Sequence, residues 1–143
     1  PRGPFFYWFF AKKALQGIMF IIFSLIAGLI HIYIFVMESL LWGSDKINKA
    51  FNVTPDVAEL NRVFAFNQGY YNLFLAVAAL SGSIMSFVGW IVVGQTLVFY
   101  SCLSMFGAAL VLLYSNKSLI RAALIQGLPP LLAIAFLSLS YLI

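Results

Sequence analysis

Long apolar runs with almost no charge are the feature that most constrains what this chain can fold into. A helix needs about twenty predominantly apolar residues to cross the hydrocarbon core of a bilayer. The sequence contains four runs of at least this length, separated by shorter polar segments. We expect them to form four membrane-spanning helices, at about residues 14–42, 63–87, 89–114 and 119–142.

The composition leads to the same fold class. Of the 143 residues, 64% are hydrophobic and 8% are charged, whereas a soluble domain is nearer half apolar and about a quarter charged. Because so few charges cannot cover a surface that faces water, most of the surface must face lipid. The sequence therefore predicts an all-α, integral membrane four-helix bundle over residues 14–143.

Two segments lie outside the predicted spans. Residues 5–10 are all aromatic, so we expect residues 1–13 to form a segment in the membrane interface, where aromatic side chains are enriched. Residues 43–61 form the one long polar loop. Within this loop, Thr54-Pro55-Asp56 has the order of an N-cap, a proline in the first turn and an acid near the helix start, which predicts a short helix.

The charged residues and the cysteine exclude several classes of function. The net charge is +4, but there is no dense Lys/Arg cluster, so we expect contact with lipid headgroups and no binding of nucleic acid. The single cysteine, Cys102, excludes an internal disulfide. One histidine and one acid within the spans do not make a metal-ligand set, and no cofactor motif is present. No metal and no cofactor are therefore expected.

Polar side chains inside the spans are the candidates for function, because they are costly in lipid and usually face the bundle interior. In the first span, Ser24, His31, Glu38 and Trp42 are separated by seven, seven and four residues. This spacing places them on one face of an α-helix. His31 is the only histidine of the chain and Glu38 is the only acid within a span. We hypothesise that these two residues are a catalytic proton donor and acceptor.

A second group of polar side chains opens the second span, and a glutamine lies near the start of the fourth. Together with Trp42, these residues lie toward the same side of the membrane as the polar loop. The sequence therefore predicts one polar pocket in that half of the bundle, covered by residues 43–61. The predicted ligand-binding residues are Trp42, Asn67, Gln68, Tyr71, Asn72 and Gln126.

Each of these residues also has a structural interpretation. Amide hydrogen bonds between membrane helices contribute about 0.6–2 kcal/mol each, so the amides of the second span are equally suited to holding helices together. Trp42 has the position of an interface anchor. Glu38 has Arg62 and His31 as candidate partners.

Four sequence elements resemble a known family: His31-Ile32-Tyr33, Glu38-Ser39-Leu40-Leu41-Trp42, the Asn-Gln-Gly-x-Tyr-Asn box that opens at Asn67, and Gln126-Gly127 with Pro129. The family is one of small bacterial four-span membrane proteins known only as a domain of unknown function. The resemblance covers about residue 14 to the C-terminus. It implies the four-span fold and a location in the bacterial inner membrane, and it implies no activity.

Three functions are compatible with this pattern. The leading hypothesis is a pocket that binds or isomerises a lipophilic small molecule by acid–base chemistry, which needs no cofactor. The second is a structural or accessory membrane subunit, and the third is a transporter of protons or small solutes. The expected partners are membrane lipid, a lipophilic small molecule, and further copies of the chain or a larger membrane complex.

Overall fold

The computed structural model describes residues 3–142, and within them the chain is a bundle of four long helices. The first long helix continues from an α-helix into one turn of π-helix, η1. Two short helices lie between the first and second long helices, and a 3₁₀ turn, η2, precedes the last. The elements are α1 (Pro4–Phe35), η1 (Val36–Leu40), α2 (Asp45–Phe51), α3 (Pro55–Leu60), α4 (Arg62–Phe87), α5 (Ile91–Ser115), η2 (Lys117–Leu119) and α6 (Ile120–Leu142).

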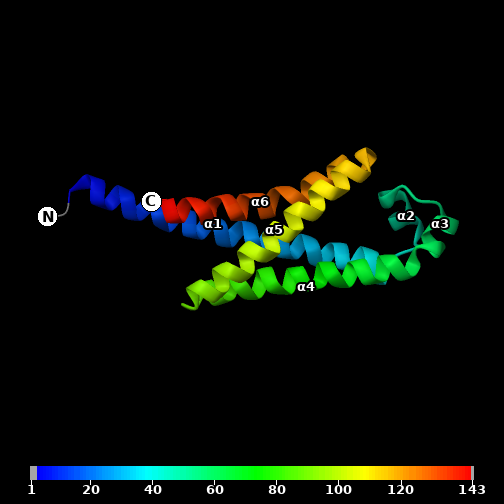
Figure 1. The fold of residues 1–143 in the computed structure, drawn as a ribbon, viewed down its shortest axis with the longest axis horizontal. Helices are drawn as coiled ribbons and strands as arrows, with labels where there is room; N and C mark the ends of the chain where they lie inside the picture. The colour runs from blue at the N-terminus through cyan, green and yellow to red at the C-terminus, as the bar shows by residue number, and fades with distance from the viewer. Residues whose placement is uncertain (1–2, 143) are drawn as a thin grey trace.

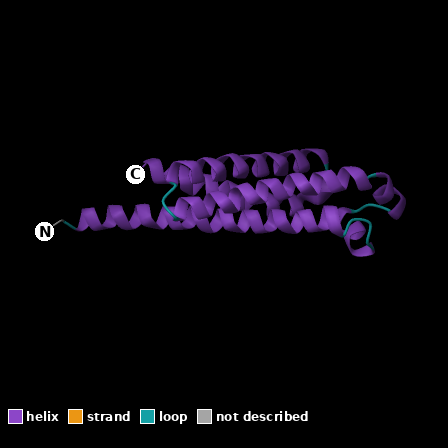
Figure 2. Cartoon of the chain, turned by 90° about the horizontal axis from the view of Figure 1, so that it is seen from below, coloured by secondary structure: helices purple, strands orange, loops and turns teal. Residues whose placement is uncertain are grey.

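The long helices form a ring in the order α1, α4, α5, α6. Helices α1 and α5 each pack against α4 and α6, and contact each other little. The start of α1 and the end of α6 lie at one end of the bundle, and α2 and α3 lie at the other (Figures 1 and 2). Toward the α2–α3 end, α5 and α6 lean away from α1 and α4 (Figure 1). This divergence is what leaves room for the site described below.

All four long helices are long and apolar enough to cross a membrane, with mean hydropathies of 2.5, 1.3, 2.1 and 1.9 over their most apolar windows. Large apolar side chains cover much of the outer surface, as in a protein whose solvent is lipid. Examples from the four helices are Leu29, Phe74, Leu103 and Ile125, each exposed. The predicted all-α membrane bundle is therefore confirmed.

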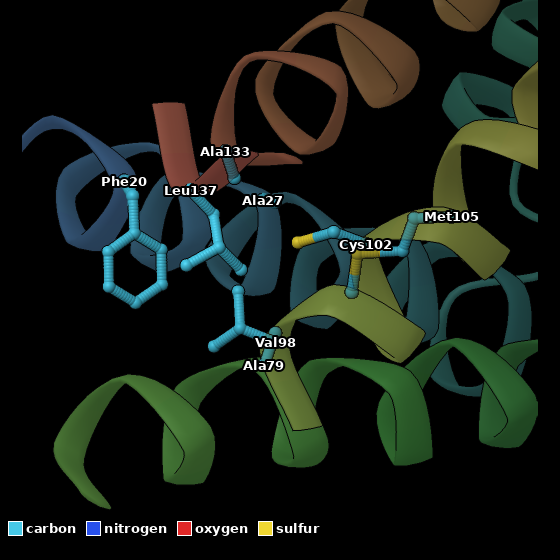
Figure 3. Close-up of a cluster of buried hydrophobic side chains, with 8 residues drawn as sticks. All are labelled: Phe20, Ala27, Ala79, Val98, Cys102, Met105, Ala133 and Leu137. Carbon is cyan, nitrogen blue, oxygen red and sulfur yellow. The ribbon is translucent and has the colours of Figure 1, made fainter. Parts of the chain in front are cut away.

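The core of the bundle consists of mostly small and medium side chains from all four helices. Its members, drawn in Figure 3, are Phe20, Ala27, Ala79, Val98, Cys102, Met105, Ala133 and Leu137. Small residues let membrane helices approach closely, since lipid offers no hydrophobic drive for their association. A Cβ built on Gly82 of α4 would lie only 2.7 Å from the Gly94 carbonyl oxygen of α5, so these helices pack backbone to backbone.

A polar contact lies beside this core, between α1 and α4. The Ser24 and Ser83 hydroxyl oxygens are 2.6 Å apart and share a hydrogen bond, and both residues are buried. Each hydroxyl also bonds to a carbonyl of its own helix. Buried hydroxyls are therefore paired in the half of the bundle far from the polar loop.

Three local features differ from, or add to, the sequence expectations. Helix α1 begins at Pro4, so the aromatic residues 5–10 are the first turns of the long helix and not a separate segment. The polar loop holds α2, which the sequence did not predict, in addition to α3. The predicted cap of α3 is confirmed, since the Thr54 hydroxyl accepts a hydrogen bond from the Val57 N–H at 3.4 Å.

Candidate functional site

The π-helix η1 is the local feature that shapes the site. The N–H of Leu41 donates to the carbonyl of Val36, five residues back, at 3.0 Å. Such a turn holds more residues than an α-helical turn and so rotates the side chains that follow it. Ser24 and Glu38, two members of the predicted common face, both contact α4, through Ser83 and Asn72. Trp42 follows the π-turn and contacts the short helices α2 and α3 instead.

Gly69 gives η1 room to pack directly on α4. A Cβ built at Gly69 would overlap the Ser39 hydroxyl and lie 3.1 Å from the Ser39 backbone nitrogen and 3.2 Å from the Glu38 Cβ. The Ser39 hydroxyl donates to the Phe66 carbonyl of α4 at 2.9 Å. This close approach brings the carboxyl group of Glu38 within reach of the polar side chains of α4.

Glu38 and Asn72 form the central polar contact of the site. Asn72 Nδ2 donates to Glu38 Oε2 at 2.8 Å and to the Gln68 carbonyl of its own helix at 3.1 Å. Asn72 is 7% exposed, while Glu38 is only partly buried. Asn72 therefore holds one oxygen of the carboxyl group, and Glu38 also lines a cavity.

This main cavity has a volume of about 650 Å³ and lies between the diverging pairs of helices. Its polar lining residues include Glu38 of η1, Gln68 and Asn72 of α4, Ser115 of α5 and Gln126 of α6. Most of the remaining wall is apolar and comes from α1, α5 and α6, with Phe51 of α2 at the end covered by the polar loop. The cavity is thus mostly apolar, with a few polar groups contributed by several helices.

A second space, the side cavity, has a volume of about 630 Å³ and shares Glu38, Phe51 and Gln68 with the main cavity. The other predicted ligand-binding residues line it: Trp42, Asn67 and Tyr71. The structure therefore divides the predicted binding set between two spaces, with the carboxyl group of Glu38 and the amide of Gln68 common to both.

His31 lies apart from both cavities. Its ring is 1% exposed, and its Nδ1 bonds to the Ala27 carbonyl of the preceding turn at 2.9 Å. It lines neither the main nor the side cavity. The structure thus brings Glu38 together with Asn72, and not with His31 as the proposed donor and acceptor pair requires.

Trp42 connects the end of the first long helix to the polar loop. Its indole Nε1 donates to the Ala58 carbonyl of α3 at 2.8 Å. Its ring meets Phe51 of α2 edge to face, with centroids 5.2 Å apart. One tryptophan therefore holds both short helices over the cavities.

An ion pair joins the C-terminal end of α3 to the start of α4. Arg62 Nη2 and Nε donate to Glu59 Oε2 at 2.6 and 2.9 Å. This hydrogen bonding, together with the positive charge of Arg62, holds the pKa of the exposed Glu59 carboxyl below its usual range. Arg62 is thus the partner of Glu59, and the carboxyl group of Glu38 is left to Asn72.

The charged side chains that line the cavities are all of one sign. Over residues 3–142, Glu38 contributes a carboxyl group to both cavities, and no Lys, Arg or His lines either of them. Across the same residues, no three His, Cys, Asp or Glu side chains gather closely enough to hold a metal ion. The chemistry available at the walls is that of one carboxyl group, several amides and hydroxyls, and aromatic rings.

Comparison with known proteins places the chain in a family. A family model described as "Protein of unknown function (DUF1304)" matches residues 25–138. The chain belongs to this family. No curated protein and no solved structure matches the chain. In this DUF1304 protein the matched residues run from within α1 to within α6, and they include Glu38, Asn72 and every other candidate site residue.

Sequence reasoning missed several parts of this DUF1304 site. Tyr33 and Phe51 line the main cavity. Tyr33 belongs to an element that resembles the family, but neither residue was predicted to bind a ligand, because aromatic residues are common throughout this chain. The contact of Ser39 with α4 was missed because a π-turn cannot be read from hydrophobic spacing. Gly69 was the one available signal, since a glycine inside a spanning helix often marks close packing.

Proposed function

We propose that this DUF1304 protein binds a lipophilic small molecule in its main cavity, with the polar head of the molecule at Glu38. The observation that carries the proposal is a cavity of about 650 Å³ with apolar walls and a carboxyl group at one side. Small-molecule sites are typically about 300–1,000 Å³ and mostly apolar, with a few polar groups that orient the ligand.

The polar groups are arranged to receive one head group. Asn72 holds Oε2 of the carboxyl group, and the amides of Gln68 and Gln126 provide further donors and acceptors on the same cavity. The apolar surfaces of α5 and α6 form much of the remaining wall and suit an alkyl or ring portion. A ligand with one polar end and an apolar body matches this distribution.

Binding is better supported than isomerisation. Proton transfer within a bound molecule needs one group that gives a proton and another that takes it, both within hydrogen-bond reach. Glu38 lines the cavity, whereas His31 is bonded inside α1. Glu38 is therefore proposed to bind and orient the ligand, and any acid–base role for His31 requires the ring to leave its present partner.

The two other hypotheses explain less of the geometry. A purely structural role accounts for the hydrogen bond between Glu38 and Asn72 but gives no purpose to the cavity beside it. Transport through a single chain would need a path along the bundle axis, and the packed core around Met105 and Val98, both fully buried, lies on that axis.

The test is to fill the cavity and follow the ligand. Ala122 of α6 lines the main cavity, whereas Ala135 of the same helix is exposed and lines neither space. We expect Ala122→Trp to lose the small molecule that co-purifies with the wild-type protein, and Ala135→Trp to keep it. Solvent extraction followed by mass spectrometry measures the occupancy of each.

Two results would overturn the proposal. One is a wild-type protein that carries no small molecule beyond bulk lipid and binds none when titrated with amphiphiles. The other is equal occupancy in the Ala122→Trp and Ala135→Trp proteins, because a ligand seated elsewhere is unaffected by a side chain placed in the main cavity.

A further inference from the structure

We infer that the head group selected by this cavity is cationic, so that the ligand is an amphiphilic amine and not a fatty acid or another lipid anion. The inference rests on the proposed function and deepens it by naming the ligand class. It follows from the charges of the side chains that line the cavity. The volume and apolar character of the cavity alone do not distinguish one head group from another.

The first observation is that no basic side chain among the described residues lines either cavity. Within residues 3–142, no Lys, Arg or His lines the main cavity or the side cavity, and Glu38 lines both. Arg62, which follows the side-cavity residue Asn61, is engaged by Glu59. A carboxylate or phosphate in the cavity would lose its hydration, face Glu38, and gain no cation in return.

The second observation is that acceptors remain available. Asn72 bonds to Oε2 of Glu38, and a carboxylate has about four lone-pair sites in all. The amide oxygens of Gln68 and Gln126 belong to the same cavity. An alkylammonium head brings three N–H donors and no acceptor, which complements one carboxyl group and two amide oxygens.

The third observation is the aromatic part of the wall. Tyr33 and Phe51 line the main cavity beside Glu38, and Trp42 lines the adjoining side cavity. The face of an aromatic ring attracts cations and does so more strongly when they are desolvated. The carboxyl group, the amide oxygens and the ring faces therefore all favour a positive charge. A neutral alcohol head could form the hydrogen bonds but would lack this charge.

Three probes with the same tail and different heads test the inference: tetradecylamine, tetradecan-1-ol and tetradecanoate. Each is titrated into the full-length protein in phosphatidylcholine nanodiscs at neutral pH, and empty nanodiscs correct for partitioning into lipid. The apparent Kd is taken from the shift of the unfolding midpoint. We expect the amine to bind about tenfold or more tightly than the alcohol, because a hydrogen bond to a charged group is stronger than a neutral one, and tetradecanoate to bind weakest.

Two variants locate the preference. Glu38→Gln keeps the shape and removes the charge, so the amine and the alcohol should bind within about threefold of each other. Asp56→Asn also converts a carboxyl group to an amide, at an exposed residue that lines neither cavity, and should leave the preference intact. If Glu38→Gln does not fold, Gln126→Lys replaces it, because a new ammonium on the wall should remove the advantage of the amine.

The outcomes separate this inference from the proposed function. Equal binding of the three probes, tightest binding of tetradecanoate, or an amine preference that survives Glu38→Gln overturns the inference and leaves the binding function in place. Binding of none of the three overturns the binding function, and the inference with it.

Discussion

Replacing Gly69 by alanine should separate the π-turn η1 from α4. This should weaken the site, although the substitution removes no polar side chain. The added Cβ would overlap the Ser39 hydroxyl and lie 3.2 Å from the Glu38 Cβ. Ser39 cannot move aside freely, because its hydroxyl donates to the Phe66 carbonyl at 2.9 Å. Either that hydrogen bond breaks or η1 moves away from α4.

The expected change in the free energy of unfolding combines two destabilising effects and one stabilising effect. Forcing an extra carbon into a packed contact costs about 1–3 kcal/mol, and the lost Ser39 hydrogen bond costs about 1 kcal/mol. Alanine is the better helix former by about 1 kcal/mol. The free energy of unfolding should therefore fall by about 1–3 kcal/mol.

The single cysteine provides the assay. Cys102 has no exposed surface and lies in the core of the bundle (Figure 3), so its thiol reacts with a reagent only when the helices separate. Labelling of Cys102 is measured in mixed micelles against the mole fraction of sodium dodecyl sulfate. The midpoint for Gly69→Ala should lie at a lower mole fraction than for the wild-type protein.

Gly107 is the matched control, because a Cβ built there meets nothing within 4 Å. Gly107→Ala should be neutral or stabilise the protein by up to about 1 kcal/mol through helix propensity. Adding Ser39→Ala to Gly69→Ala removes the overlapping oxygen and should restore part of the stability. If Gly69→Ala and Gly107→Ala unfold alike, the close approach of η1 and α4 is refuted.

Two further predictions concern the polar loop. Trp42→Phe keeps a ring but removes the N–H that donates to Ala58, so backbone hydrogen exchange should increase in α2 and α3 and stay unchanged in the core of α5; equal protection in both proteins would contradict the anchoring role. The pKa of Glu59 lies below its usual range because of Arg62, so their ion pair stabilises the junction at neutral pH, and this stabilisation disappears as the pH falls through the lowered pKa. An NMR titration should show the pKa of Glu59 rising toward its ordinary value in Arg62→Gln, and an unchanged pKa would exclude the pairing.

The number and placement of the spanning helices could be predicted from the sequence because hydropathy and length are sums over neighbouring residues. The cap at Thr54 was predictable for the same reason, since the hydroxyl bonds to a backbone group three residues away. The start of the first long helix was not predicted: the sequence indicated a span from residue 14, anchored by Lys12 and Lys13, and α1 continues through both lysines to Pro4.

The partner of Glu38 could not be predicted from the sequence. Spacing by sevens pointed to His31, and charge pointed to Arg62. In the structure His31 bonds to the Ala27 carbonyl of its own helix, and Arg62 pairs with Glu59, which is close to it in sequence. The hydrogen-bond partner of Glu38 is Asn72 of α4, which is 34 residues further along the chain.

By itself, the sequence determined that the chain forms four apolar helices with most of their amide side chains toward one end, because each of these properties depends on residues close together in the chain. Only the tertiary structure decided which polar groups meet and where space is left between them. The contact of Glu38 with Asn72 depends on the π-turn η1 and on its packing against Gly69. These are contacts between residues far apart in the chain.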